Sequence, residues 1–126
     1  MDRWNSHKIE IVNNYRQYLM DNRPEYKDIG NKSLVEVVWE NAVKKSRDGK
    51  VRNPYSPYVE LNWVNGQSRF DQWHMGHIPG KEYWRMVDKL IEGEYSEEQF
   101  LKEYNNPNNY QPEDPKSNMS HKNEKK

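Results

Sequence analysis

Aromatic side chains carry much of the apolar content of this sequence, and they limit what its core can be. Only 33% of the 126 residues are hydrophobic, and the mean hydropathy of −1.39 leaves few aliphatic side chains to bury. The chain has five tryptophans, nine tyrosines and two phenylalanines. Each large ring buries roughly 150–250 Å² when enclosed, so a few rings can replace many aliphatic residues. We therefore expect one ordered domain with a modest core built largely from rings.

The charge of the chain is balanced overall but segregated along the sequence. Lysine and arginine together number 20, as do aspartate and glutamate, so the formal net charge is zero. Residues 44–52 and 116–126 are locally basic, whereas residues 82–103 are acidic. The two basic segments form a positive groove for nucleic acid if the fold brings them together, and are otherwise solvated surface.

The residue types limit how the chain can bind a metal or meet a membrane. It contains no cysteine, so it forms neither a disulfide nor a thiolate zinc site. Histidine, carboxylate and amide groups remain as metal ligands. No apolar run approaches the ~20 residues that cross a bilayer, and the first residues lack the apolar region of a signal peptide. We expect no membrane insertion by this segment.

Apolar spacing predicts helices in the first and last thirds of the chain. Helical periodicity extends over residues 6–20, 34–46 and 81–91. Ser6 and Ser33 precede the first two of these segments and are predicted N-caps.

A second set of signals predicts short extended and helical pieces. Residues 50–53 and 58–63 are expected to pair as a hairpin, and residues 68–75 to form a strand or extended arm. A short helix is expected after Ser96, which has the spacing of a capping box to Gln99. We expect a loop over residues 105–112 and a last short helix near residue 115.

Two histidine-bearing segments carry the most specific functional signal. They are Trp73-His74-Met75-Gly76-His77-Ile78-Pro79-Gly80 and Asn118-Met119-Ser120-His121. Both are rich in turn residues. An imidazole titrates near neutral pH, so one histidine can take a proton from water while a second group holds a cation. This combination is typical of a small metal-assisted phosphodiesterase.

Each histidine also has a structural interpretation. His77 lies in a turn-rich stretch, where a histidine is often structural or merely exposed. His74 and His77 would point to opposite faces of a strand. Asn118 and His121 would share one face of a helix, where the amide can fix a loop while the imidazole binds a cation. His7 is expected on the surface of the first helix.

Acidic residues near these segments supply candidate ligands and acids. Glu113 and Asp114 precede Asn118 and are placed to orient an imidazole or to bind a metal. Glu124 follows His121 by three residues. An exposed acid with no specific role remains the alternative for each.

Further motifs form a joint pattern with these histidines. They are Val38-Trp39-Glu40-Asn41-Ala42, Asp48-Gly49-Lys50-Val51, Tyr83, Glu92-Gly93-Glu94-Tyr95-Ser96, Phe100-Leu101-Lys102-Glu103-Tyr104-Asn105-Asn106-Pro107, Asn109-Tyr110-Gln111-Pro112-Glu113 and Asn118-Met119-Ser120-His121-Lys122-Asn123-Glu124. Over roughly residues 23–124 the chain resembles the GH-E group of the HNH/endonuclease VII nuclease superfamily. Such domains are similar to the C-terminal toxin modules of bacterial polymorphic toxins. Those modules are carried on larger secreted proteins and are neutralised by a dedicated immunity protein.

The resemblance implies roles for individual residues. His77 would be the general base, and His121 a metal ligand at the end of a ββα-metal unit. Asn118 would hold the loop. Glu113 or Glu124 would be the acid in the name of the group.

Two positions depart from the pattern of related nucleases. Many HNH nucleases place an aspartate or histidine directly before the base, where this chain has Gly76. Many relatives also have an aspartate where this chain has His74, which makes His74 a candidate ligand of a different kind. Another carboxylate would have to replace the ligand that is missing at Gly76, or metal binding would be weak.

The expectation is an α+β fold. N-terminal helices (about 6–46) and a small hairpin accompany a ββα-metal core, with the catalytic part at about 48–124. The function expected is a nuclease toxin that hydrolyses DNA or RNA with a divalent metal such as Mg²⁺, Mn²⁺ or Zn²⁺. The residues expected to contact the nucleic-acid backbone are Lys81, Arg85, Lys116 and Lys122. The partners expected are nucleic acid and an immunity protein, and the site of action is the cytoplasm of a target cell after secretion within a larger toxin.

Three alternatives stay open at the level of the sequence. A metal-independent ribonuclease would use two histidines as acid and base and leave a 2′,3′-cyclic phosphate. A non-catalytic nucleic-acid-binding module is favoured by Gly76 standing where a ligand is usual. A protein-interaction domain would have no affinity for nucleic acid.

Overall fold

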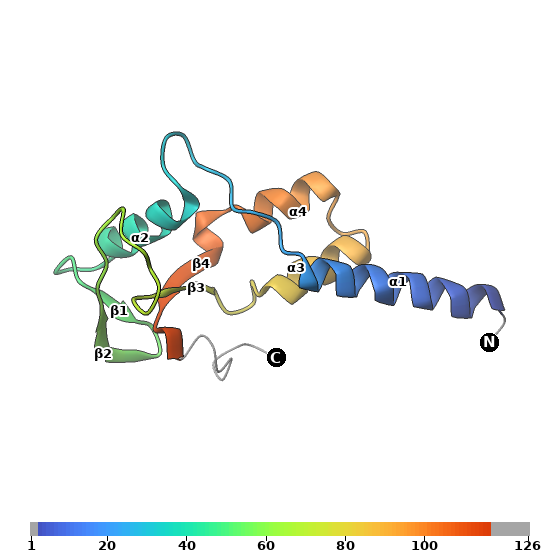
Figure 1. Cartoon of the computed structure of the whole chain (residues 1–126), viewed down its shortest axis with the longest axis horizontal. Coiled ribbons are helices and arrows are strands. Elements are labelled where there is room, and N and C mark those ends of the chain that lie inside the picture. Colours follow the sequence, from blue (N-terminus) through green and yellow to red (C-terminus); the bar gives the residue numbers. More distant parts are fainter. Residues whose placement is uncertain (1–2, 117–126) are drawn as a thin grey trace.

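The computed structural model of this chain describes residues 3–116 and has an α+β fold, as expected (Figure 1). In chain order its elements are helices α1 (Arg3–Asp21) and α2 (Leu34–Lys45), strands β1 (Val51–Asn53), β2 (Ser56–Leu61) and β3 (His74–His77), helices α3 (Tyr83–Ile91) and α4 (Glu97–Tyr104), the 3-10 turn η1 (Pro107–Asn109) and strand β4 (Tyr110–Glu113). The strands form two antiparallel pairs, β1 with β2 and β3 with β4.

The first pair is a local hairpin, while the second joins distant parts of the chain. Strands β1 and β2 pair Val51 with Leu61, and a register irregularity after Arg52 tightens the turn. Strands β3 and β4 pair across α3, α4 and η1, which all lie between them in sequence. The helical pair α3–α4 is therefore an insertion between the two strands that carry His77 and Glu113.

Rings build the core, as the composition predicts. One cluster lies between α2 and the strands, where the Trp73 side chain is fully buried. Its ring centroid lies 5.2 Å from that of Trp39 and 5.5 Å from that of Trp63. The second cluster lies between α1, α3 and α4 and contains Leu19, Tyr83, Met86, Val87, Phe100 and Tyr104.

Tyr26 connects the two clusters. It packs against both of them from the segment between α1 and α2. Its ring stacks on Tyr104 at 5.4 Å and meets Tyr110 edge-on at 5.8 Å. The connector is therefore part of the packed structure and runs past the end of β3.

Two of the three predicted helix caps are confirmed. The Ser33 hydroxyl accepts a hydrogen bond from the Glu36 amide, and that of Ser96 accepts one from the Gln99 amide, each at 3.1 Å. The prediction that Ser6 caps the first helix is wrong. Helix α1 already begins at Arg3, since no glycine or proline interrupts residues 3–6.

The largest error of the sequence-based prediction concerns β4, which was expected to be loop. Asn109 to Glu113 show no alternation of apolar and polar residues, and Pro112 cannot donate a backbone hydrogen bond. The strand forms because it is an edge strand whose partner is supplied by β3. The extended arm expected over residues 68–75 is likewise shorter, since only His74–His77 is strand.

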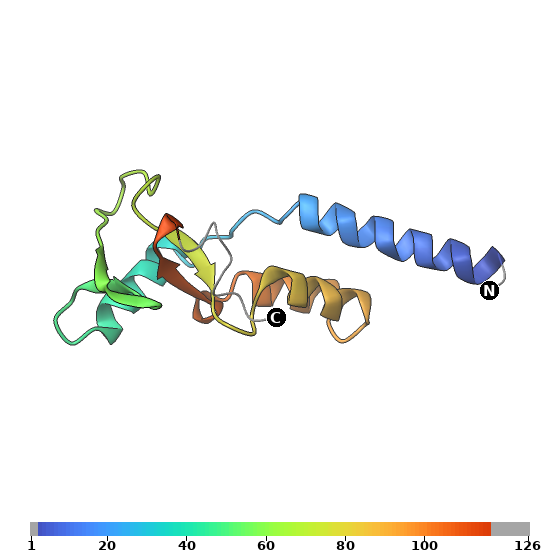
Figure 2. The same cartoon turned by 90° about the horizontal axis from the view of Figure 1, so that it is seen from below.

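Helix α1 runs beside α3 at its C-terminal end, and its N-terminal end extends beyond α3 and α4 in both views (Figures 1 and 2). The Tyr83 hydroxyl donates a hydrogen bond of 2.6 Å to the Leu19 carbonyl, and Arg16 pairs with Asp88 at 2.6 Å. Within the part of the chain that the structure describes, no helix has the length and apolarity needed to span a membrane.

Candidate active site

The β3–β4 ribbon brings the first histidine segment next to Glu113. Its register pairs His74 with Glu113, Gly76 with Gln111, and His77 with Tyr110. Because successive side chains alternate between the faces of a strand, His74, Gly76, Gln111 and Glu113 belong to one face. His77 belongs with Tyr110 to the other face. His74 and His77 therefore lie on opposite faces of β3, as expected for a strand.

Gly76 and Glu113 fit each other sterically. A Cβ built on Gly76 would overlap the Glu113 side chain at Oε2, Cδ and Cγ. The Glu113 side chain is held there in a buried position, with Gln111 Nε2 donating to its Oε2 at 3.2 Å. The space that a side chain at residue 76 would take is thus occupied by a carboxylate from the neighbouring strand.

His77 lies at the end of β3 with its two ring nitrogens in different surroundings. Nε2 lies 3.3 Å from Nη1 of Arg23. Because a guanidinium can only donate a hydrogen bond, Nε2 is the acceptor. In the neutral ring the proton is then on Nδ1. Nδ1 is buried and makes no hydrogen bond within residues 3–116, although the Lys81 backbone lies near the ring. The ring packs against Tyr110 with centroids 4.7 Å apart.

These surroundings keep the imidazole neutral at physiological pH. Burial, and then the positive charge of Arg23, lower the pKa of His77 from 6.5 to about 4. The Lys81 backbone, and then the charge of Glu82, act in the opposite direction and offset only part of the effect. A neutral imidazole is the protonation state that a general base requires.

The comparison with known families identifies the class of protein. Residues 48–124 match the GH-E family model, described as an HNH/ENDO VII superfamily nuclease with conserved GHE residues. The chain belongs to the GH-E family. No solved structure matches it significantly. Membership makes the protein a nuclease, a hydrolase of nucleic acid.

The fold brings a Gly-His pair next to a glutamate, which are the residue types in the name of the family. Gly76-His77 is the only Gly-His pair in the sequence. Glu113 is the acid that lies against Gly76 in the structure. The other candidate acid, Glu124, lies outside the described residues, as do Asn118, His121 and Lys122. The chain becomes helical at residues 115 and 116, directly after β4.

A polar cluster surrounds the Glu113 carboxylate on the side of the hairpin. Gln111 Nε2 also lies 3.3 Å from the Tyr55 hydroxyl. The amide of Asp114 donates to Asn53 Oδ1 at 3.3 Å, which attaches the end of β4 to β1. Burial, and then the charge of Glu113, raise the pKa of Tyr55. Sequence analysis missed Asn53, Tyr55 and Gln111 because contacts between distant residues leave no local pattern.

Glu82 shapes the turn after His77. Its buried carboxylate accepts a hydrogen bond of 2.6 Å from the Gly80 amide and pairs with Arg85 Nε at 3.1 Å. Arg85, expected to contact nucleic acid, is therefore engaged with Glu82, and its Cζ lies 4.2 Å from the Trp84 ring centroid. Lys81 and Lys116, two other expected contacts, are exposed.

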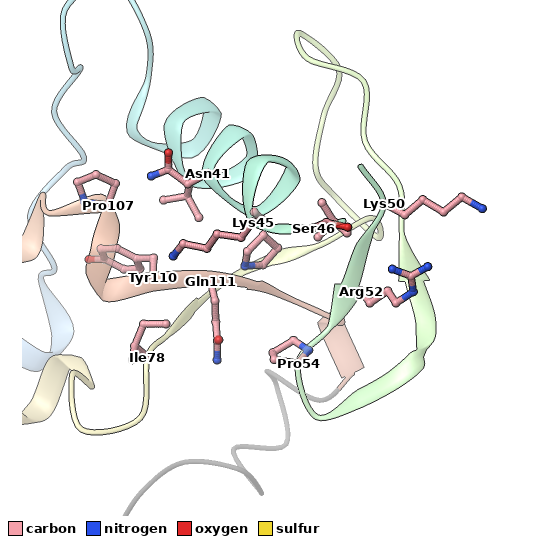
Figure 3. A pocket seen from close by; sticks show the side chains of 14 residues that line it. Asn41, Lys45, Ser46, Lys50, Arg52, Pro54, Ile78, Pro107, Tyr110 and Gln111 are labelled. Carbon is pink, nitrogen blue, oxygen red and sulfur yellow. The ribbon is translucent and has the colours of Figure 1, made fainter. Parts of the chain in front are cut away.

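A groove of about 360 Å³ lies between α2 and β4. Its lining includes Asn41, Lys45, Ile78, Tyr110 and Gln111. Figure 3 shows the Lys45 side chain extending across the groove toward Tyr110, whose ring also packs against His77. One end of the basic segment 44–52 thus reaches the neighbourhood of His77.

Two other cations of that segment have acidic partners. Arg52 Nη2 pairs with Asp48 at 2.6 Å, and Lys50 pairs with Glu60 at 3.5 Å. Within residues 3–116 no three histidine or acidic side chains gather into a potential metal centre. His74 and Glu113 are register partners, and they contribute one imidazole and one carboxylate to the same face.

Proposed function

We propose that this GH-E domain is an endonuclease in which His77 activates water for attack on a phosphodiester. The observation that carries the proposal is the neutral His77 imidazole at the end of β3. Its Nε2 is the accepting nitrogen, and His77 follows Gly76, against which Glu113 packs on the opposite face of the ribbon. Family membership supplies the reaction class.

The proposed step conserves atoms and protons. A water molecule gives one proton to His77 Nε2 while its oxygen bonds to phosphorus. The P–O3′ bond breaks, leaving a 5′-phosphate on one product and a 3′ oxygen that takes a proton from solvent on the other. The buried Nδ1 keeps its proton throughout, so His77 becomes imidazolium and then returns its extra proton to solvent.

The GH-E carboxylate fits the metal that such nucleases generally use. The Glu113 side chain takes the place that a ligand at residue 76 would have, and His74 is its register partner. Carboxylate oxygen and imidazole nitrogen suit Mg²⁺, Mn²⁺ or Zn²⁺. We propose that Glu113 and His74 hold the ion together with His121 and Asn118 from the segment after β4, and that Glu124 is the alternative acid. When bound, the ion would offset charge that develops on the phosphate and on the leaving oxygen.

The same carboxylate weighs against the non-catalytic alternative. Gly76 favours a binding module only if nothing replaces the ligand that is usual at this position. Glu113 supplies a carboxylate there from β4.

We propose that nucleic acid lies across the groove between α2 and β4. Lys45 extends over this groove, and Lys81 is exposed beyond the turn that follows His77. Lys116 and Lys122 would extend the contact along the segment after β4. Contacts of this kind act on phosphates, so binding should be independent of sequence and should weaken as salt rises.

The biological role that we infer rests on the resemblance of GH-E domains to toxin modules. The domain would be secreted as part of a larger bacterial toxin and would act in the cytoplasm of a competing cell. A dedicated immunity protein would protect the producer. The check is growth of bacteria that express the domain in the cytoplasm, where wild type should arrest growth and His77→Ala should not.

One cleavage experiment tests the activity. Closed-circular plasmid DNA and total RNA are incubated with wild type, His77→Ala and, as a matched control on exposed α1, His7→Ala. Each is assayed with Mg²⁺, Mn²⁺, Zn²⁺ or EDTA. We expect metal-dependent cutting with 5′-phosphate ends by wild type and His7→Ala, and none by His77→Ala. Cutting that survives EDTA with 2′,3′-cyclic ends would indicate the metal-free ribonuclease. Absence of cutting in every lane would contradict the endonuclease proposal.

A further inference from the structure

An arginine from the segment before the matched family region lies next to His77, the proposed general base. Arg23 lies in the connector between α1 and α2, outside residues 48–124. Its Nη1 lies 3.3 Å from His77 Nε2, and its Cζ lies 4.5 Å from the centroid of the Tyr83 ring. The guanidinium therefore rests on an aromatic face and contacts the nitrogen that would accept the proton from water.

The connector that carries Arg23 is fixed on both sides. Before it, the Tyr83 hydroxyl donates to the carbonyl of Leu19, near the end of α1. After it, Tyr26 stacks on Tyr104, and the Lys27 amide donates to Asn105 Oδ1 at 2.7 Å. Arg23 itself is exposed to solvent. Its place beside His77 is thus set by packed neighbours on either side of it in the chain.

The charge of Arg23 is not matched by an acid in the described part of the chain. The other arginines near the site have carboxylate partners: Arg85 pairs with Glu82, and Arg16 with Asp88. For Arg23 no carboxylate lies within ion-pair distance in residues 3–116. A cation beside an imidazole also opposes protonation of that base. An anion that binds to Arg23 beside His77 during the reaction explains why Arg23 has no acidic partner. It also explains why a cation lies next to the base.

We infer that Arg23 is a phosphate-binding residue of the active site, and that its guanidinium donates to a non-bridging oxygen of the phosphodiester held next to His77. This inference rests on the proposed nuclease function. In the unliganded state Arg23 donates to Nε2 and covers its lone pair. When phosphate binds, the guanidinium turns to the phosphate oxygens and leaves Nε2 available to water. The N-terminal segment thus completes a site whose other groups lie in the family region.

The test measures phosphate binding without turnover. The His77 Cε1–H signal is followed by NMR in EDTA while thymidine 3′,5′-bisphosphate is added. Wild type is compared with Arg23→Gln, Arg23→Lys and, as a matched control, Lys27→Gln, which removes an exposed cation from the same connector. We expect Kd for the bisphosphate to rise about tenfold or more in Arg23→Gln, to recover in part in Arg23→Lys, and to stay within about twofold in Lys27→Gln. Thermal unfolding of each variant checks that the fold is kept.

The same variants are then assayed for cleavage of the substrate polymer that wild type cuts. A fall in kcat/KM for Arg23→Gln that parallels the loss of bisphosphate binding supports the inference. If Arg23→Gln raises the pKa of His77 but leaves Kd for the bisphosphate unchanged, Arg23 only positions the base and the inference is overturned. If wild type cuts no polymer yet binds the bisphosphate in an Arg23-dependent way, the phosphate site stands and the nuclease proposal fails.

Discussion

The Glu113 carboxylate fills the space beside Gly76 that any larger residue would need. Gly76 does not have the positive φ found at Gly30, Gly49 and Gly80, so its backbone does not require glycine. The requirement comes from the neighbouring strand. Gly76 and Glu113 are therefore one steric unit, and His77 follows it in the chain.

This steric unit predicts non-additive mutations. Gly76→Ala should lower the free energy of unfolding by about 1–3 kcal/mol, because the added methyl displaces the Glu113 side chain. In a Glu113→Ala background the same change should cost less than about 0.5 kcal/mol, because the space is then open. Urea unfolding of the four proteins gives the coupling. Equal costs in both backgrounds would show that Glu113 is not what excludes the methyl group.

Metal affinity should depend on the same carboxylate. Glu113→Gln keeps the shape of the side chain but removes its charge, so the affinity for Mn²⁺ measured by calorimetry should fall about tenfold or more. Glu60→Gln is the control, since Glu60 is an exposed acid paired with Lys50 on the hairpin. An unchanged Mn²⁺ affinity in Glu113→Gln would place the ion elsewhere.

The pH dependence of activity should reflect the lowered pKa of His77. The free enzyme loses its neutral base only near pH 4, so kcat/KM should stay high down to about pH 5. An ordinary histidine would lose activity below 6.5. The measurement is a pH profile of single-turnover cleavage at fixed metal concentration. An acid limb near 6.5 would mean that the substrate reaches a more exposed imidazole than the structure shows.

Stability should depend on pH through the same group. Between pH 4 and 6.5 the unfolded chain binds a proton at His77 that the folded protein does not bind, so stability rises with pH across this window. His77→Gln should remove a pH-dependent contribution of up to about 3 kcal/mol, fully present above 6.5 and lost as pH falls toward 4. Urea unfolding at pH 5 and pH 7.5 in EDTA gives the difference between the two proteins.

One buried hydrogen bond contributes to the attachment of α1 to the rest of the protein. Tyr83→Phe removes the hydroxyl that donates to the Leu19 carbonyl and leaves that carbonyl without this partner. We expect a loss of about 1–2 kcal/mol in unfolding free energy. Tyr58→Phe is the matched control because the Tyr58 side chain is 99% exposed. Equal stability of both variants would show that water replaces Tyr83 at the Leu19 carbonyl.

Local signals in the sequence predicted the local parts of this fold. Ser33 and Ser96 cap helices because their hydroxyls reach an amide three residues later, which is a property of the nearby chain alone. The hairpin around Pro54 follows from turn residues between two extended segments. His77 was recognised because it lies in a motif that is contiguous in sequence.

Parts of the site that depend on distant contacts were not predicted. Strand β4 has no strand-like pattern of its own and forms by pairing with β3. Arg23 is one cation in a polar connector, and nothing near it in the sequence indicates His77 as its neighbour. Glu82 was one acid among several until its burial under the Gly80 turn distinguished it. Each of these roles is set by tertiary packing, to which a single sequence gives no direct access.

The insertion of α3 and α4 between β3 and β4 has a kinetic consequence. The two strands pair across more than thirty residues of intervening chain, so the entropy of closing that loop opposes their meeting until the helical pair has formed and shortened it. We therefore expect His77 and Glu113 to come together late in folding, after much of the surrounding structure. A partly folded chain would contain helices and a tryptophan cluster yet cut nothing, and catalytic competence would return with the slowest folding phase.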